Sequence, residues 1–182
     1  MTETNLYSVT IPAMKKALMA LSGLLDKTAA HAATKESSWR PAAVFEEALL
    51  NDRLIFDQFS LTKQIQVACD NAKGCAARLS GKENPKHDDT EKSVADLKAR
   101  IDKTVAFLDS IKPEDVIGKE GVQVTLPYFP GKYMTGFEYV TEYALPNFYF
   151  HVTTAYSILR KNGLEVGKND YIGGLPLKDT DA

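Results

Sequence analysis

The chain has 182 residues, of which 44% are hydrophobic and 25% are charged, and its formal net charge is −2. This size and composition predict one globular domain with a sizeable core. The small net charge and the absence of an arginine-rich run argue against nucleic acid or a membrane surface as a partner. No segment approaches the roughly 20 apolar residues that a membrane span requires.

The N-terminal residues and the cysteines predict a cytoplasmic protein. The segment Met1–Tyr7 carries neither the basic nor the apolar region of a signal peptide. Cys69 and Cys75 fall on one predicted helix, about 9 Å of rise apart, which is beyond disulfide reach. We expect both thiols to be reduced.

The first predicted helix covers about residues 8–34. Its apolar side chains recur three and four positions apart, as on the buried face of a helix: Ile11, Met14, Leu18, Leu21, Leu25, Ala29 and Ala32. Residues 35–59 are irregular, with a short helix expected over 42–50. This segment is rich in aromatic and aliphatic residues, so we expect it to pack across the helices as a cover.

The second and third helices are predicted over residues 60–79 and 90–111. Ser60 is a good N-cap, and Gly81 follows the end of the second helix. The second helix has an alanine-rich stripe, which predicts close helix–helix approach. The apolar residues of the third helix recur near 3.5-residue spacing, as in bundles.

After the third helix, the spacing of apolar residues changes to the alternation typical of strands. It predicts short strands at 122–126 and 132–135, separated by a turn that contains proline and glycine. A fourth helix is expected over 135–161, bent at Pro146. Together these elements predict an all-α, antiparallel four-helix bundle with a short β-ribbon between its third and fourth helices. We expect one domain over residues 1–173 and a flexible C-terminal tail over 174–182.

A polar stripe on the otherwise apolar fourth helix is the main candidate site. Asn147, His151 and Thr154 lie four and three positions apart, so they share one face of the helix. Buried polar groups need hydrogen-bond partners. We therefore expect either an internal polar network or the floor of a pocket for a small-molecule ligand, with Gln64 and Tyr156 as further members.

A metal site is the alternative interpretation. His31, on the flank of the first helix, would approach His151 if the first and fourth helices pair at this end. Two histidines and a carboxylate suit a divalent metal, with Asp26, Asp57 or Asp70 as the third ligand. The metal set assigned is His31, His151 and Asp70, with zinc, nickel or iron as the ion. By the helical wheel Asp70 lies opposite the alanine stripe, and it faces solvent unless another element covers it.

The remaining histidine, His87, and a search for common catalytic and binding motifs give no further candidate site. His87 lies in a polar loop, where we expect it in solvent. The sequence contains no glycine-rich phosphate loop and no Gly-x-Ser-x-Gly, Cys-x-x-Cys or His-Glu-x-x-His motif. These absences argue against the common nucleotide-binding, hydrolase and zinc-finger classes.

Three segments, 59–74, 145–156 and 159–173, resemble an uncharacterised bacterial branch of the DinB/YfiT-like superfamily. The resemblance implies a four-helix bundle and, in that superfamily, a metal held by one histidine on the second helix and a His-x-x-x-His pair on the fourth. Characterised relatives include metal-dependent thiol transferases. This chain departs from the pattern: the second helix has no histidine, and Asn147 and Ala155 flank His151 at four residues.

These observations predict a degenerate metal site in a ligand-binding or non-catalytic protein that needs no cofactor. The alternative is a divalent-metal-dependent transferase or hydrolase that uses His151 and His31. Aromatic residues are more abundant in 39–59 and 139–156 than one small bundle needs, so we also expect a homodimer.

Overall fold

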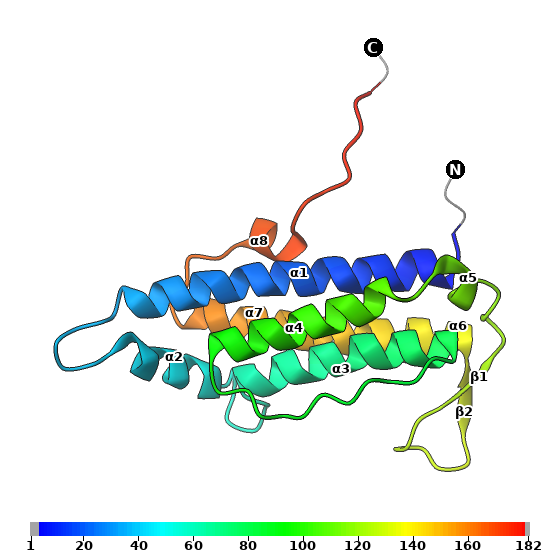
Figure 1. The fold of residues 1–182 in the computed structure, drawn as a ribbon, viewed down its shortest axis with the longest axis horizontal. Coiled ribbons are helices and arrows are strands. Elements are labelled where there is room, and N and C mark those ends of the chain that lie inside the picture. Colours follow the sequence, from blue (N-terminus) through cyan, green and yellow to red (C-terminus); the bar gives the residue numbers. More distant parts are fainter. Residues whose placement is uncertain (1–3, 181–182) are drawn as a thin grey trace.

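Four long helices form the body of the protein (Figure 1). The computed structural model describes residues 4–180. The long helices are α1 (Leu6–Ala33), α3 (Leu61–Ser80), α4 (Val94–Asp109) and α7 (Leu145–Lys161). α3 packs mainly against α7, and α1 packs mainly against α4. The predicted four-helix bundle is confirmed.

The direction of the chain through the bundle adds a feature that periodicity did not reveal. α3 and α4 run in the same direction, because residues 81–93 return along the length of the bundle before α4 begins (Figure 1). The most extensively packed antiparallel pairs are therefore α1 with α4 and α3 with α7. This crossover segment has no regular secondary structure.

Local side-chain caps set the helix ends. Ser60 caps α3, and α3 stops at Gly81, whose φ of 73° suits glycine. α4 begins at Val94 rather than at residue 90, because Ser93 and Asp96 form a reciprocal capping box. Both helices begin at the same end of the bundle (Figure 1).

The shorter elements occupy the two ends and one side of the bundle. They are α2 (Ala42–Asn51), α5 (Pro113–Val116), β1 (Gln123–Thr125), β2 (Tyr133–Thr135), α6 (Gly136–Glu138) and α8 (Lys168–Ile172). β1 and β2 pair antiparallel, with Val124 opposite Met134, so the predicted ribbon is confirmed. α8 was not predicted; it packs on α1, where Lys27 donates to Asp170 over 2.7 Å.

The expected irregularity at Pro146 takes the form of a π-helical stretch, η1 (Tyr139–Ala144), directly before α7. The Leu145 N–H bonds to the carbonyl of Val140, five residues back. A proline ring collides with the carbonyl four residues before it in a regular α-helix. The wider π turn relieves this crowding and lets the helix continue into α7.

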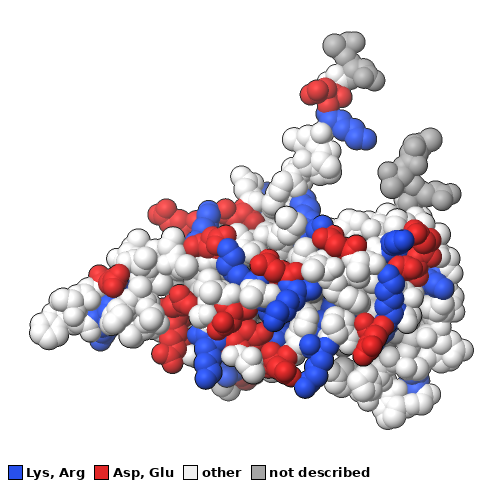
Figure 2. Space-filling model, in the orientation of Figure 1, with Lys and Arg blue, Asp and Glu red and all other residues white. Residues whose placement is uncertain are grey.

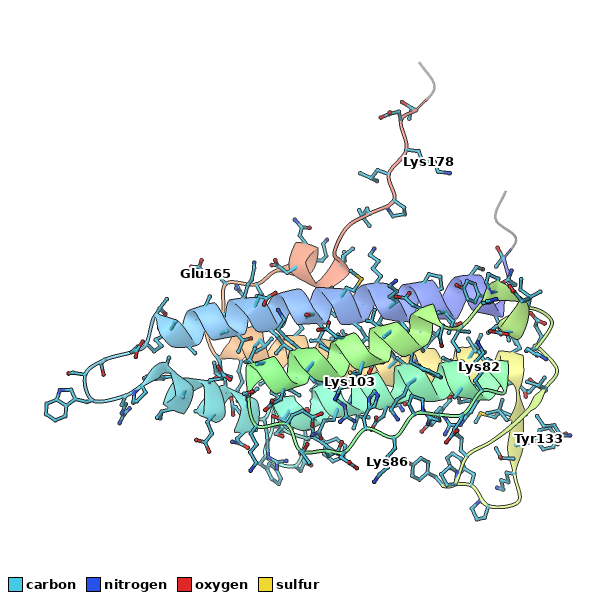
Figure 3. The ribbon with its side chains drawn as sticks, viewed as in Figure 1. Lys82, Lys86, Lys103, Tyr133, Glu165 and Lys178 are labelled. Carbon is cyan, nitrogen blue, oxygen red and sulfur yellow. The ribbon has the colours of Figure 1, made fainter. Side chains whose placement is uncertain are left out.

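The C-terminal segment after α8 leaves the bundle. Residues 174–180 have no regular secondary structure and are exposed throughout. Figure 3 shows Lys178 on this segment, away from the helices. Residues 181–182 of the predicted tail lie outside the described part of the chain. Within residues 4–180, no helix is long and apolar enough to cross a membrane.

The core and the surface match an ordinary globular domain. Cys69 and Cys75 are free and fully buried, and burial raises the pKa of each thiol to about 12. Figure 2 shows positive and negative side chains interspersed over the visible face of the bundle. This face carries no broad surface of one charge, as the composition led us to expect.

Candidate functional site

The centre of the candidate site is a hydrogen bond between α3 and α7. His151 Nδ1 lies 2.6 Å from Gln64 Oε1, and both residues are buried. Gln64 Nε2 donates to the carbonyl of Phe59 over 3.2 Å. The glutamine therefore ties α7 to the segment that enters α3.

These two bonds define the protonation of the imidazole. The Phe59 carbonyl can only accept, so the amide NH₂ of Gln64 faces it and Oε1 faces His151. His151 Nδ1 must then carry the proton, and Nε2 is the basic nitrogen of the neutral ring. Burial lowers the pKa of His151 below its ordinary value of 6.5, which also favours the neutral ring.

Two aromatic rings flank the imidazole. Phe59 stacks nearly parallel to His151 with ring centroids 6.4 Å apart, and Phe150 meets it edge-on at 5.2 Å. Both phenylalanines are about half exposed, at 48% and 52%. The histidine is therefore at the base of an aromatic surface, not in the middle of the core.

A second polar pair lies further along the same helix interface. Asn147 Nδ2 donates to Asn71 Oδ1 over 2.9 Å. Asn71 follows Gln64 by seven residues, the spacing that returns to the same face of a packed helix. Asn71 Nδ2 is buried and has no hydrogen-bond partner among the described residues. The predicted polar stripe thus consists of two cross-helix pairs that share no bond.

The other two predicted members do not join these pairs. The Thr154 hydroxyl donates to the carbonyl of Phe150 on its own helix over 2.7 Å. The Tyr156 hydroxyl donates to the carbonyl of Val166 over 3.5 Å, and its ring packs edge-on against Tyr171. Both residues therefore stabilise α7 and its C-terminal extension.

The predicted metal ligands are not brought together. His31 lines a cavity of about 570 Å³ beside α2, whereas His151 bonds to Gln64. Asp70 accepts from Arg100 over 2.8 Å and lies 3.3 Å from Lys73. Across residues 4–180, no group of three or more His, Cys, Asp or Glu side chains is placed to hold a metal ion. His31, His151 and Asp70 therefore lie in three separate environments and do not form the predicted metal site.

Asp70 belongs to a charged cluster that the sequence interpretation missed. Arg100 on α4 is only 2% exposed and reaches Asp70, Asp89 and Glu91, all within 3.1 Å. Gln66 donates to the same Glu91 over 2.8 Å. One signal was available: Arg100 follows Leu97 by three residues, so it falls on the buried side of α4.

His87, expected in solvent, is partly buried. It lies on the crossover segment beside a cavity of about 370 Å³ that Arg100 also lines, and its Nδ1 has no partner in the described part of the chain. Burial, together with the nearby charges of Lys73 and Arg100, lowers the pKa of His87. His87 is shielded from solvent because ion pairs from Lys63 and Arg100 to Asp89 hold the crossover segment against the bundle.

The donor chemistry at His151 does not fit a divalent metal. Catalytic zinc sites use three protein ligands drawn from histidine, cysteine and carboxylate side chains. The polar pairs between α3 and α7 supply one imidazole and the amides of Gln64, Asn71 and Asn147. Such groups can donate hydrogen bonds to, and accept them from, a polar ligand.

Comparisons with known proteins agree with this fold. Residues 6–172 match a family model described as a domain of unknown function, DUF1993. A DinB family member protein from Shewanella denitrificans, with a crystal structure at 1.83 Å resolution, is 43% identical. The match covers 96% of each chain with a TM-score of 0.87. No curated protein matches the chain. The chain therefore belongs to the DUF1993 family and has the helical bundle of a DinB family member.

Proposed function

We propose that this protein acts by binding and not by metal-dependent catalysis, as a cytoplasmic homodimer with a degenerate metal site. The observation that carries the proposal is the Gln64–His151 hydrogen bond, because an amide stands beside the one histidine between α3 and α7. The cytoplasmic location is supported by the two free, buried thiols, which suit a reducing compartment.

The geometry of His151 supports a site that has lost its metal. A metal-bound histidine usually donates its second N–H to an oxygen acceptor, and Gln64 Oε1 accepts in that way here. The ion itself, however, needs further ligands. The residues that pair across α3 and α7 nearby are asparagines, which are poor ligands for zinc. Such a site retains an orienting hydrogen bond and serves polar recognition.

The proposed dimer uses the aromatic surface next to His151. Phe56 is 86% exposed, and Ile55, Phe59 and Phe150 are each about half exposed. Exposed apolar groups of this kind mark interaction surfaces. A second copy would cover these rings and exclude water from the imidazole beneath them.

Light scattering after size-exclusion chromatography tests the dimer. We expect the mass of two chains for the wild type and of one chain for the double variant Phe56→Ser and Phe150→Ser. Phe129→Ser is the matched control, because Phe129 on the ribbon is similarly exposed at 48%. A wild-type monomer would contradict the dimer, as would a dimer that survives the double substitution.

Elemental analysis of protein purified without an affinity tag or chelator tests the metal-free assignment, with His151→Ala alongside. We expect far less than one zinc, nickel or iron per chain in both proteins. A near-stoichiometric metal in the wild type that disappears in the variant would instead establish a metal site at His151.

A further inference from the structure

A cavity of about 570 Å³ at the α2 end of the bundle has no part in the site described above. It lies where three helices finish: α1 at Ala33, α2 at Asn51 and α7 at Lys161. Its volume is in the range of small-molecule sites. His31, which the sequence singled out, lines this cavity.

One side of the cavity is rich in hydrogen-bond acceptors. The Asn51 amide donates to the carbonyl of Glu47 over 3.0 Å, and the Asn162 amide donates to Asp52 and to the carbonyl of Ile158. Both side-chain oxygens are therefore available as acceptors. The C-terminal ends of helices carry partial negative charge, so the three ends favour a positively charged group here.

Asp52 contributes little net charge to this environment. Its carboxylate accepts from Asn162 over 2.6 Å and lies 3.0 Å from Lys161. Burial tends to raise the pKa of Asp52, but the hydrogen bonds and the charge of Lys161 outweigh burial and lower it. Asp52 is thus an ionised group already paired within the protein.

The other side of the cavity offers donors and an apolar wall. Lys35 and His31 line the cavity, and neither side chain has a hydrogen bond or ion pair with another described residue. Phe45, Ala48 and Leu49 form the apolar wall from α2. One cavity therefore combines a cationic corner, an acceptor-rich corner and a hydrophobic surface.

We propose that this cavity binds a small apolar α-amino acid as its zwitterion. The carboxylate contacts Lys35 and His31, the ammonium group contacts the Asn51 and Asn162 side-chain oxygens, and the aliphatic side chain packs on Phe45 and Leu49. A ligand with only one charge leaves one corner of the cavity without a partner. The inference rests on the proposed binding role and names the ligand class and its place.

The test uses three probes of the same shape on the full chain, followed by ¹H–¹⁵N NMR. L-Leucine carries both charges, 4-methylpentanoate lacks the ammonium group, and isopentylamine lacks the carboxylate. We expect saturable shifts at Asn51 and Asn162 with leucine, and affinity about tenfold lower for each of the other two probes, since a charged hydrogen-bonded contact contributes on that order.

Single variants assign each charge to its corner. Lys35→Gln is expected to weaken leucine and 4-methylpentanoate about tenfold and to leave isopentylamine unchanged. Asn51→Ala should weaken leucine and isopentylamine but not 4-methylpentanoate. Lys178→Gln is the matched control, because Lys178 lies on the C-terminal segment away from the bundle (Figure 3).

Ala48→Trp provides a steric test that keeps every charge. Ala48 is exposed on α2, so the indole is expected to fill the cavity without disturbing the core and to abolish leucine binding. The proposal is overturned if leucine gives no saturable shifts, if a single-charge probe binds as well, or if Ala48→Trp binds normally. None of these results would alter the metal content, so failure here is distinct from failure of the metal-free assignment.

Discussion

The two sides of α3 are held to the rest of the protein by different chemistry. Toward α7, the polar contacts are neutral: Gln64 pairs with His151 in a buried contact, and Asn71 pairs with Asn147 in a partly buried one. Toward α4, the contacts are ionic, with Arg100 among Asp70, Asp89 and Glu91. The same helix thus presents an amide-based interface and a charge-based interface.

The difference follows from what each side has to hold. α7 brings its own apolar residues, so its polar pairs only need to satisfy one another. The crossover at residues 81–93 contains no large apolar side chain and cannot be held by a hydrophobic face. Ion pairs hold it instead: Asp89 pairs with Lys63 on α3, and Glu91 pairs with Arg100 on α4. At the start of the segment, Lys82 pairs with Asp115 on α5. Lys86 lies on this segment and Lys103 on the adjoining α4 (Figure 3).

Removal of the buried cation should have the largest effect. Arg100→Met leaves Glu91, which is only 9% exposed at its side chain, without its main partner. We expect a loss of about 3 kcal/mol in the free energy of unfolding, measured by urea denaturation. Lys103→Met, one turn along the same helix and exposed, should change it by less than about 0.5 kcal/mol. Equal effects would show that the cluster does not stabilise the crossover.

The neutral interface should respond through coupling between its partners. Gln64→Leu leaves the buried His151 N–H without an acceptor, which should cost about 2 kcal/mol. The double variant with His151→Phe removes both polar groups and should cost less than the sum of the single changes. A double-mutant cycle by urea denaturation measures this coupling. Strict additivity would mean that the hydrogen bond contributes nothing.

Acid should weaken the neutral interface before the ionic one. The pKa of His151 is below 6.5 in the folded protein, so the unfolded chain takes up a proton first. The free energy of unfolding therefore falls as pH drops below about 7. His151→Gln should reduce this dependence of the unfolding free energy on pH. Part of the dependence should remain, because the pKa of His87 is also lowered in the folded protein.

The ionic side has a lower pH window. Burial tends to raise the pKa of Glu91, but hydrogen bonds from Arg100 and Gln66 outweigh it and lower the pKa below the ordinary 4.5. Stability from this group is present above that value and is lost as pH falls further. An Arg100→Met protein should lose this acid-dependent step, whereas His151→Gln should retain it. The converse pattern would refute the division between the two sides.

The smallest effect is expected at the surface of the crossover. Lys63 and Asp89 pair at 2.6 Å, but both side chains are about 40% exposed, so solvent screens the interaction. Lys63→Gln should lower the free energy of unfolding by about 0.5 kcal/mol or less, and added salt should reduce the difference. A loss of unfolding free energy close to that of Arg100→Met would contradict this, because it would show that the exposed pair stabilises the protein as much as the buried cation does.

Periodicity predicted the helices well because each buries one apolar face, as the stripes of residues 8–34 and 90–111 show. It did not predict the parallel course of α3 and α4, because a polar connection has no period that marks its path. The polar face of Asn147 and His151 could be located from spacing alone. Their partners could not, since Gln64 and Asn71 are distant in sequence and become neighbours only when α3 and α7 pack. The buried position of Arg100 could be located from its spacing to Leu97, but its partner Asp70 on α3 could not.

The state of the His151 ring tests the central claim most directly. A long-range ¹H–¹⁵N NMR spectrum of the imidazole distinguishes its two neutral tautomers and a metal-bound ring. The account predicts a neutral ring protonated at Nδ1 near pH 7, a pattern that Gln64→Leu disturbs. A ring protonated at Nε2, or one whose spectrum changes on addition of a chelator, would contradict it.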